Sequence, residues 1–96
     1  MPGCARLADT CSGHAPCYPP RNNVAASTDV FVNGRGVHRL GDSWAPHGSG
    51  DCRPHGSQLA SGSPNVFTNG LPTGRLGDSV ACGSNVASAS LDVIIN

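Results

Sequence analysis

The residues best suited to chemistry in this chain are three histidines and one cysteine in loops rich in glycine and proline. They are His14, His47, His55 and Cys82. Three imidazole nitrogens and one thiolate make a closed tetrahedral set, the ligand type and number that structural zinc prefers. Mixed nitrogen and sulfur ligation also favours zinc over iron. We therefore expect one structural zinc ion per chain, whose binding free energy stabilises the folded loops.

A catalytic role for these residues has less support in the sequence. A catalytic zinc site uses three protein ligands, an open position for water and a general base such as glutamate. The chain contains no glutamate, and most of its six aspartates belong to a repeated motif. We therefore expect the protein not to be an enzyme, neither a zinc hydrolase nor a thiol enzyme.

The other four cysteines leave several roles open. Cys17 and Cys52 each lie three residues from one of the candidate histidines. Either of them could replace a ligand, bind a second ion or take part in a disulfide. Cys4 and Cys11 have no partner that the sequence identifies, so packing as small apolar side chains is the default expectation.

The elements that must position the candidate ligands come from a sequence repeat. Two copies span 27–42 and 63–78, and each begins with Ser-x-x-Val-Phe-x-Asn-Gly and ends with Arg-Leu-Gly-Asp. In both, the Arg lies twelve residues after the Ser. A third copy starts at 90–96 and finds its second half, Arg-Leu-Ala-Asp, at 6–9. The repeat therefore closes on itself, which predicts pseudo-three-fold symmetry with adjacent chain ends.

Each repeat unit reads as a β-hairpin followed by a loop. β-Branched and aromatic residues fill the predicted strand, and Asn-Gly supplies the positive φ angles of a tight turn. The Arg and Asp of Arg-Leu-x-Asp stay three residues apart in every copy, and we interpret both as structural. His38 lies inside the first hairpin rather than in a loop, and we expect it to be solvent-exposed.

The loops after each repeated Asp differ from one another and carry the candidate ligands. His14 and His47 each follow such an Asp by five residues, and Cys82 follows one by four. Equivalent positions on three pseudo-equivalent units converge near the pseudo-axis. The longest loop adds His55 as a fourth ligand. The metal site therefore follows from the repeat as well as from the residue types.

Composition indicates one small all-β or irregular domain over residues 1–96. The chain has 13 Gly and 8 Pro but neither Glu nor Lys, and no stretch carries apolar residues at helical spacing. A domain with so small a core usually needs a disulfide, a metal or a partner surface.

Charge and hydropathy exclude some partners and suggest a compartment. Six Arg balance six Asp, so the basic stripe of a nucleic-acid-binding protein is missing. No segment approaches the roughly 18 apolar residues of a membrane helix. The N-terminus lacks the apolar region of a secretory signal, so we expect synthesis in the cytoplasm without a signal peptide.

The repeat units, the Met-Pro-Gly-x-Ala-Arg-Leu-x-Asp start and the Ser-x-Asp-Val-Ile-Ile-Asn end resemble PAAR-repeat proteins over essentially the whole chain. The resemblance implies a cone of short β-hairpins with zinc near its apex, bound by the same three histidines and Cys82. It also implies a flat base that caps the trimeric β-helical spike of a contractile injection machine, a phage tail or a type VI secretion system. The stretch 13–20 and the extra cysteines look more like phage-associated members.

The expected function is therefore mechanical. One monomer would cap and sharpen one spike trimer in a virion tail or secretion apparatus, as a stand-alone tip delivered to the envelope of a target cell. It would contact the target membrane transiently and need neither nucleic acid nor a small-molecule substrate. An extracellular disulfide-stapled binding module is the alternative. Our expected docking face carries Val30, Val32, Val66 and Ile94–Ile95.

Overall fold

The computed structural model describes residues 2–96, which form short β-hairpins and loops and contain no helix. Three two-stranded antiparallel sheets pair neighbouring strands along the chain. These pairs are β1 (Phe31–Val32) with β2 (Arg35–Gly36), β3 (Ser43–His47) with β4 (His55–Gln58), and β5 (Phe67–Thr68) with β6 (Leu71–Pro72). The predicted small all-β fold is therefore confirmed. Among the same residues, no helix is long and apolar enough to cross a membrane.

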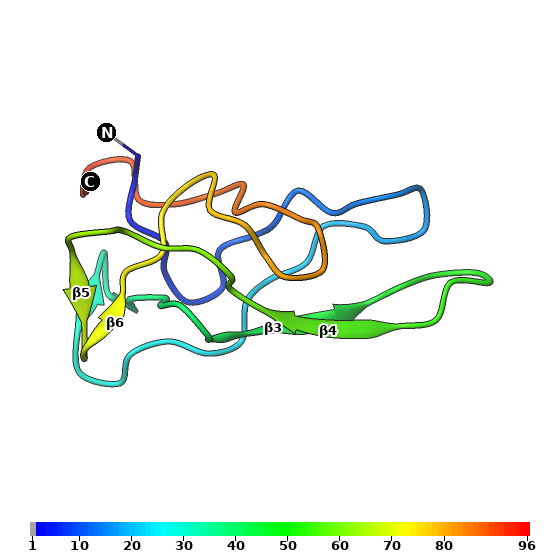
Figure 1. Ribbon diagram of the computed structural model, residues 1–96, viewed down its shortest axis with the longest axis horizontal. Helices are drawn as coiled ribbons and strands as arrows, with labels where there is room; N and C mark the ends of the chain where they lie inside the picture. Colours follow the sequence, from blue (N-terminus) through cyan, green and yellow to red (C-terminus); the bar gives the residue numbers. More distant parts are fainter. Residues whose placement is uncertain (1) are drawn as a thin grey trace.

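Two hairpins, β1–β2 and β5–β6, gather at the broad end of the molecule, and the two chain ends take the place of a third. Asn33 and Asn69 open the turns of β1–β2 and β5–β6 with φ angles of 55° and 53°. In the third unit Gly3 pairs with Ile94, and the amide of Ile95 donates to the carbonyl of Pro2 at 2.9 Å. Figure 1 shows the two ends side by side next to β5 and β6. The repeat closes as the sequence predicts.

A ring of three backbone hydrogen bonds marks the pseudo-three-fold axis. Ala5 donates to Gly74 at 2.9 Å, Gly74 to His38 at 2.8 Å, and His38 to Ala5 at 3.0 Å. The three residues are equivalent, since each precedes the Arg of its repeat. The predicted exposure of His38 is wrong, because its side chain is 0% exposed. Where the three units meet, Ala5 has only a methyl group and Gly74 has no side chain, which leaves room for the imidazole of His38.

The Arg–Asp pair of each repeat closes its own turn. In every copy the Asp carboxylate accepts hydrogen bonds from the backbone amide and the guanidinium of the Arg three residues earlier. The Nε–Oδ2 distances are 3.0, 2.9 and 3.0 Å for Arg6–Asp9, Arg39–Asp42 and Arg75–Asp78. The three pairs make the same contacts, as expected if the Arg and the Asp of each repeat are structural residues.

Away from the broad end, the molecule narrows into an arm built on β3 and β4 (Figure 1). Its extents along the principal axes are 39 × 24 × 22 Å. A small core where body meets arm consists of Ala5, Cys11, Trp44, Leu59, Val80 and Val86. Cys4 and Cys11 are buried free thiols, in line with their expected packing role. The arm carries the longest loop of the chain and, with it, two of the candidate ligands.

Candidate metal centre

The four predicted ligand side chains lie together near the base of the arm. One ligand atom from each of His14, His47, His55 and Cys82 lies within 4.8 Å of all the others. His47 and His55 are directly opposed across β3 and β4. The register shifts between Trp44 and His47, so both of these side chains are buried although they lie three residues apart on one strand. A bulge thus directs β3 first into the core and then into the site.

The other two ligands come from tight turns of different loops. The amide of His14 donates to the carbonyl of Tyr18 at 2.9 Å, which closes the turn after the histidine. Cys82 lies between Val80 and Ser84, whose backbones are joined by a 2.9 Å hydrogen bond. Loops from all three parts of the repeat therefore contribute, as the loop spacing predicts.

The ligand atoms are arranged as a small cation would need them. The Nε2 atom of His14 lies 3.2 Å from that of His47 and 3.1 Å from that of His55, and the last two are 2.7 Å apart. The Sγ atom of Cys82 lies 3.9 Å from Nε2 of His47. A tetrahedral zinc ion with bonds of about 2.0–2.3 Å separates its ligands by about 3.3–3.6 Å. The observed separations of 2.7–3.9 Å lie on both sides of this range, so the four donors could hold a metal ion of this size.

Hydrogen bonding fixes the tautomer of one ligand. Nδ1 of His47 lies 2.8 Å from the carbonyl oxygen of Pro19, which can only accept. Nδ1 therefore carries the proton, and Nε2 presents a lone pair to the centre of the cluster. Three imidazole nitrogens that face one another in this way repel unless a proton or a metal cation lies between them.

The surroundings also favour the metal-binding protonation states. Partial burial, followed by the neighbouring His47, lowers the pKa of both His14 and His55. Burial raises the pKa of the Cys82 thiol, but hydrogen bonds from Ser84 and Arg21 outweigh burial and lower it overall. Neutral imidazoles and a thiolate are the forms that bind metal. The cluster could therefore hold a metal ion.

The family model of the PAAR motif matches residues 19–88. The chain belongs to the PAAR motif family. The matched segment contains His47, His55 and Cys82, whereas His14 precedes it. Comparison with curated proteins finds no match.

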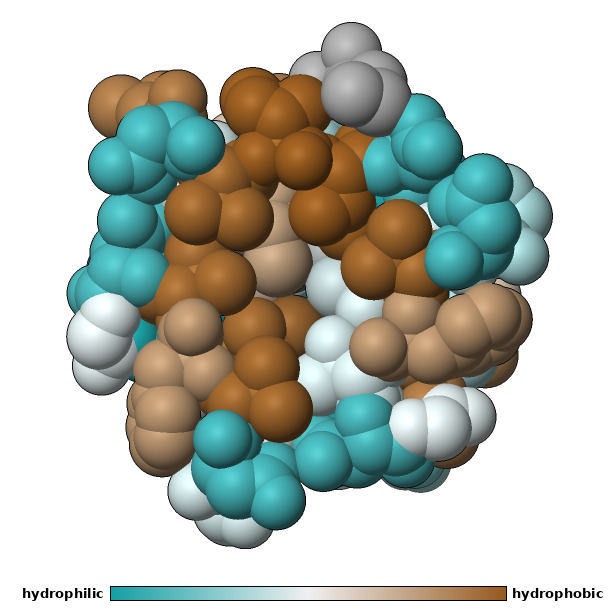
Figure 2. Space-filling view, turned by 90° about the vertical axis from the view of Figure 1, so that its left-hand side faces the viewer, coloured by the Kyte–Doolittle hydropathy of each residue, from teal (hydrophilic) through white to brown (hydrophobic). Residues whose placement is uncertain are grey.

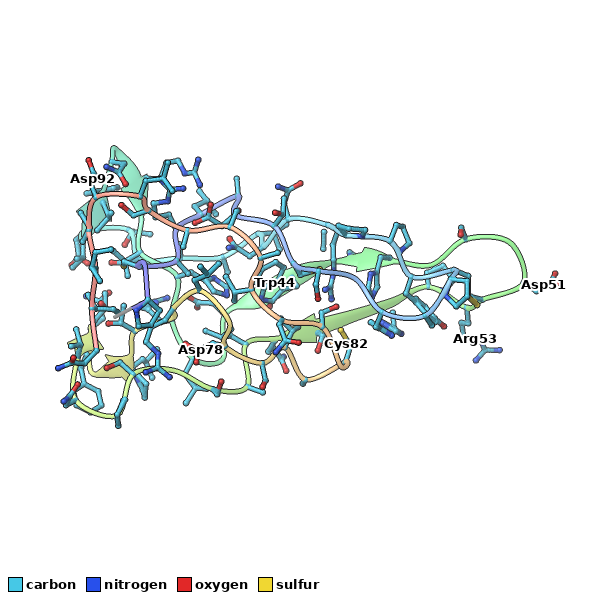
Figure 3. All side chains as sticks on the ribbon, turned by 90° about the horizontal axis from the view of Figure 1, so that it is seen from above. Trp44, Asp51, Arg53, Asp78, Cys82 and Asp92 are labelled. Atoms are coloured by element: carbon cyan, nitrogen blue, oxygen red, sulfur yellow. A yellow bond between two sulfur atoms is a disulfide. The ribbon has the colours of Figure 1, made fainter. Side chains whose placement is uncertain are left out.

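In this PAAR protein the candidate metal site is not the outermost part of the arm. Cys17 and Cys52 form a disulfide across the two loops that carry the histidines, with their Cα atoms 6.0 Å apart. Figure 3 shows Cys82 nearer the body, with Asp51 and Arg53 farther out at the tip of the arm. The sequence leaves several roles open for Cys17 and Cys52, and in the structure they form a disulfide. The disulfide thus joins the two loops covalently, farther out along the arm than the candidate metal site.

Three residues next to the cluster are not predicted by the sequence pattern. Tyr18 stacks on the imidazoles of His14 and His55 with ring centroids 4.7 and 4.3 Å apart. The hydroxyl of Ser84 lies 3.8 Å from the sulfur of Cys82, and a guanidinium nitrogen of Arg21 lies 3.5 Å from it. The only signal for Tyr18 was its place beside Cys17, and neither Arg21 nor Ser84 belongs to the repeat.

Proposed function

We propose that this PAAR protein is a mechanical spike tip that caps the trimeric β-helical spike of a contractile injection machine. Membership of the PAAR family supports a role related to the spike tip of such machines. The finer proposal is that the broad end docks on the spike while the arm leads into the target membrane. The protein would act without turnover. It would be made without a signal peptide and leave the cell as part of the machine.

The observation that carries this proposal is the apolar surface at the broad end. Figure 2 shows this face, with hydrophobic residues across it and hydrophilic residues around much of its rim. Three pseudo-equivalent hairpin residues are exposed: Phe31 by 59%, Phe67 by 58% and Ile94 by 47%. A clustered apolar surface on a small protein often marks a binding site. The two phenylalanines extend the docking face expected from the sequence, which named only aliphatic residues of the same hairpins.

Pseudo-symmetry explains why a trimer is the partner proposed. A trimeric β-helix ends in three equivalent sets of strand edges, and exposed edges of this kind need cover. One PAAR chain offers three similar repeat units around one axis, so a single monomer can match all three protomers. The proposed stoichiometry is one chain per spike trimer.

The same proposal assigns one structural zinc ion to His14, His47, His55 and Cys82. When bound, zinc would supply four bonds that hold three loops of a domain with a small core. The disulfide between Cys17 and Cys52 would hold the outer part of the arm in the same way. Together they would give a narrow Gly- and Pro-rich arm the rigidity that penetration of a membrane requires.

The alternative of an extracellular binding module draws its support from the disulfide. Three of the five cysteines are nevertheless free, and one of these, Cys82, lies in the candidate metal site. Elemental mass spectrometry separates the two functions. About one zinc ion per chain supports the spike tip, and a metal-free protein with the same disulfide supports the binding module.

Docking is tested by native mass spectrometry of the protein mixed with a trimeric β-helical spike protein from the same genome. We expect one chain per trimer. The double variant Phe31→Asp and Phe67→Asp should lose the complex and keep its metal. The matched control is Val24→Asp, which alters a residue that is also 59% exposed but lies outside the hairpins. A three-to-three complex, or full binding by the double variant, would contradict the proposal.

A further inference from the structure

Arg21 is a buried cation without a carboxylate partner. Arg21 as a whole residue is 8% exposed. Arg6, Arg35, Arg39 and Arg75 each bind an aspartate, whereas no ion pair includes Arg21 within residues 2–96. A buried charge is costly unless hydrogen bonds or an opposite charge compensate for it. The contacts of Arg21 therefore indicate what this guanidinium does.

Every contact of the guanidinium is directed toward the core or the metal cluster. Nε donates to the carbonyl oxygen of Ala45 at 2.7 Å, and Nη1 donates to the sulfur of Cys11 at 3.0 Å. The central carbon lies 5.4 Å from the centre of the Trp44 ring, where the cation contacts the π-system. Nη2 points to the sulfur of Cys82 at 3.5 Å. Three contacts hold the group in place, and the fourth reaches a proposed ligand.

We propose that Arg21 is a positioning residue of the metal centre, whose guanidinium donates a hydrogen bond to the thiolate sulfur of Cys82. This inference rests on the proposed function in one respect, namely that the cluster binds a metal. A hydrogen bond from a cationic donor orients the sulfur and withdraws electron density from it. The bound thiolate is then less nucleophilic, and its fixed orientation opposes its release from the metal.

The fork shape of the guanidinium is needed for this role. Arg21 reaches two sulfur atoms and a carbonyl at once, through three different nitrogens. A lysine ammonium is a point charge on a flexible stem and cannot make these three bonds in the same fixed geometry. The Arg21→Lys variant therefore keeps the charge and loses most of the positioning.

Cobalt(II) is the probe for the test, because its thiolate charge-transfer absorption reports directly on the sulfur of Cys82. In cobalt-loaded protein we expect Arg21→Met and Arg21→Lys to shift this band, with the larger shift for Met. In zinc-loaded protein we expect iodoacetamide to alkylate Cys82 faster, and zinc affinity to fall by about 10–100-fold for Arg21→Met. Arg53→Met, an exposed arginine of the same arm, is the matched control and should change none of these quantities.

The outcomes separate positioning from simple packing. A packing role would lower the thermal stability of Arg21→Met but leave the charge-transfer band and the alkylation rate of folded protein unchanged, which would overturn the inference. If Arg21→Met does not fold, the band of Arg21→Lys decides alone. If wild-type protein binds neither cobalt nor zinc, the metal part of the proposed function fails with the inference. If wild-type binds metal and both variants match it, only the inference fails.

Discussion

The broad end and the arm of this protein are held together by different forces. At the broad end, three similar repeat units meet through backbone hydrogen bonds, and the ring of Ala5, His38 and Gly74 repeats one bond three times. In the arm the symmetry is lost. Side chains from three unlike loops converge on one point there, and a disulfide joins two of those loops.

This difference shows how a chain of 96 residues can be both symmetric and pointed. Backbone hydrogen bonds depend little on side-chain identity, so two copies of the octapeptide and a related segment at 90–96 are enough to build the three units of the broad end. A narrow arm has too little interior for an apolar core, and its loops need bonds that do not depend on buried area. The candidate metal ligands and the disulfide would meet that need.

The strongest way to break the comparison is to remove one metal ligand. Cys82→Ala or His55→Ala should lose the metal and most of its contribution to stability, which is on the order of 10 kcal/mol for small zinc domains. Elemental mass spectrometry measures the metal content. Hydrogen exchange should then rise first in the arm, while the amides of the axial ring remain the slowest to exchange.

The matched control for ligand removal is Cys4→Ala, which alters a buried free cysteine of the broad end. It should keep the metal and the slow exchange of the arm. Equal loss of protection from hydrogen exchange in both regions after Cys82→Ala would show that the broad end and the arm unfold as one cooperative unit. That result would contradict the comparison between the two regions.

A smaller effect is expected from a methyl group added to the axial ring. A Cβ atom at Gly74 would lie 2.8 Å from Cδ2 of Leu59 and 3.0 Å from the carbonyl oxygen of His38. Gly74→Ala should therefore destabilise the protein by about 1–3 kcal/mol through overpacking. Denaturant unfolding measures the loss, and the metal content of the folded variant should stay the same.

Gly56→Ala provides the comparison for this substitution. Gly56 lies on β4, and a Cβ atom there would make only an ordinary contact of 3.6 Å with the carbonyl oxygen of Trp44. We expect it to change stability by much less than Gly74→Ala. If Gly56→Ala destabilised the protein more than Gly74→Ala, tight packing at the axis would not be what limits the stability of the broad end.

The sequence predicted the elements that repeat and missed several that do not, among them the β3–β4 hairpin, which lies in a segment expected to be a loop. Asn33 and Asn69 identified two hairpin turns because tight turns need the positive φ angles that Asn-Gly provides. The candidate ligands were found because three of them occupy matching loop offsets. Arg21 was missed because it matches no position in the repeat, and its role depends on contacts with Cys11 and Cys82 that no spacing reveals.

His38 is the informative error. Its place inside a hairpin suggested exposure, since short hairpins in small proteins usually face solvent. The sequence did contain a signal for burial. The residues at the equivalent positions are Ala5 and Gly74, and small residues of this kind are expected where three units meet on an axis. Equivalence in a closed repeat thus predicts burial as well as fold.

The last prediction concerns the pH dependence of stability that the buried His38 gives to the broad end. Burial lowers the pKa of His38 from its ordinary 6.5, against smaller opposing effects of the Ala25 carbonyl and Asp42. Above the unfolded pKa of about 6.5 the imidazole is neutral in both states, so stability is fully present. As pH falls below that value, the unfolded chain takes up the proton first and stability declines. The decline ends once pH passes below the folded pKa.

His38→Gln removes this titration and keeps a donor for the Ala25 carbonyl, which His38 Nδ1 contacts at 2.8 Å. Unfolding midpoints of wild type and variant are compared between about pH 7.5 and 5.0, with zinc present in both. Both proteins share the same candidate ligands, so the loss of metal in acid is common to them and cancels in the difference. We expect wild type to lose more stability than the variant below about pH 6.5, since only wild type carries the buried imidazole. Parallel curves would mean that His38 takes up its proton equally in the folded and unfolded states, and would contradict the burial of the imidazole at the axis.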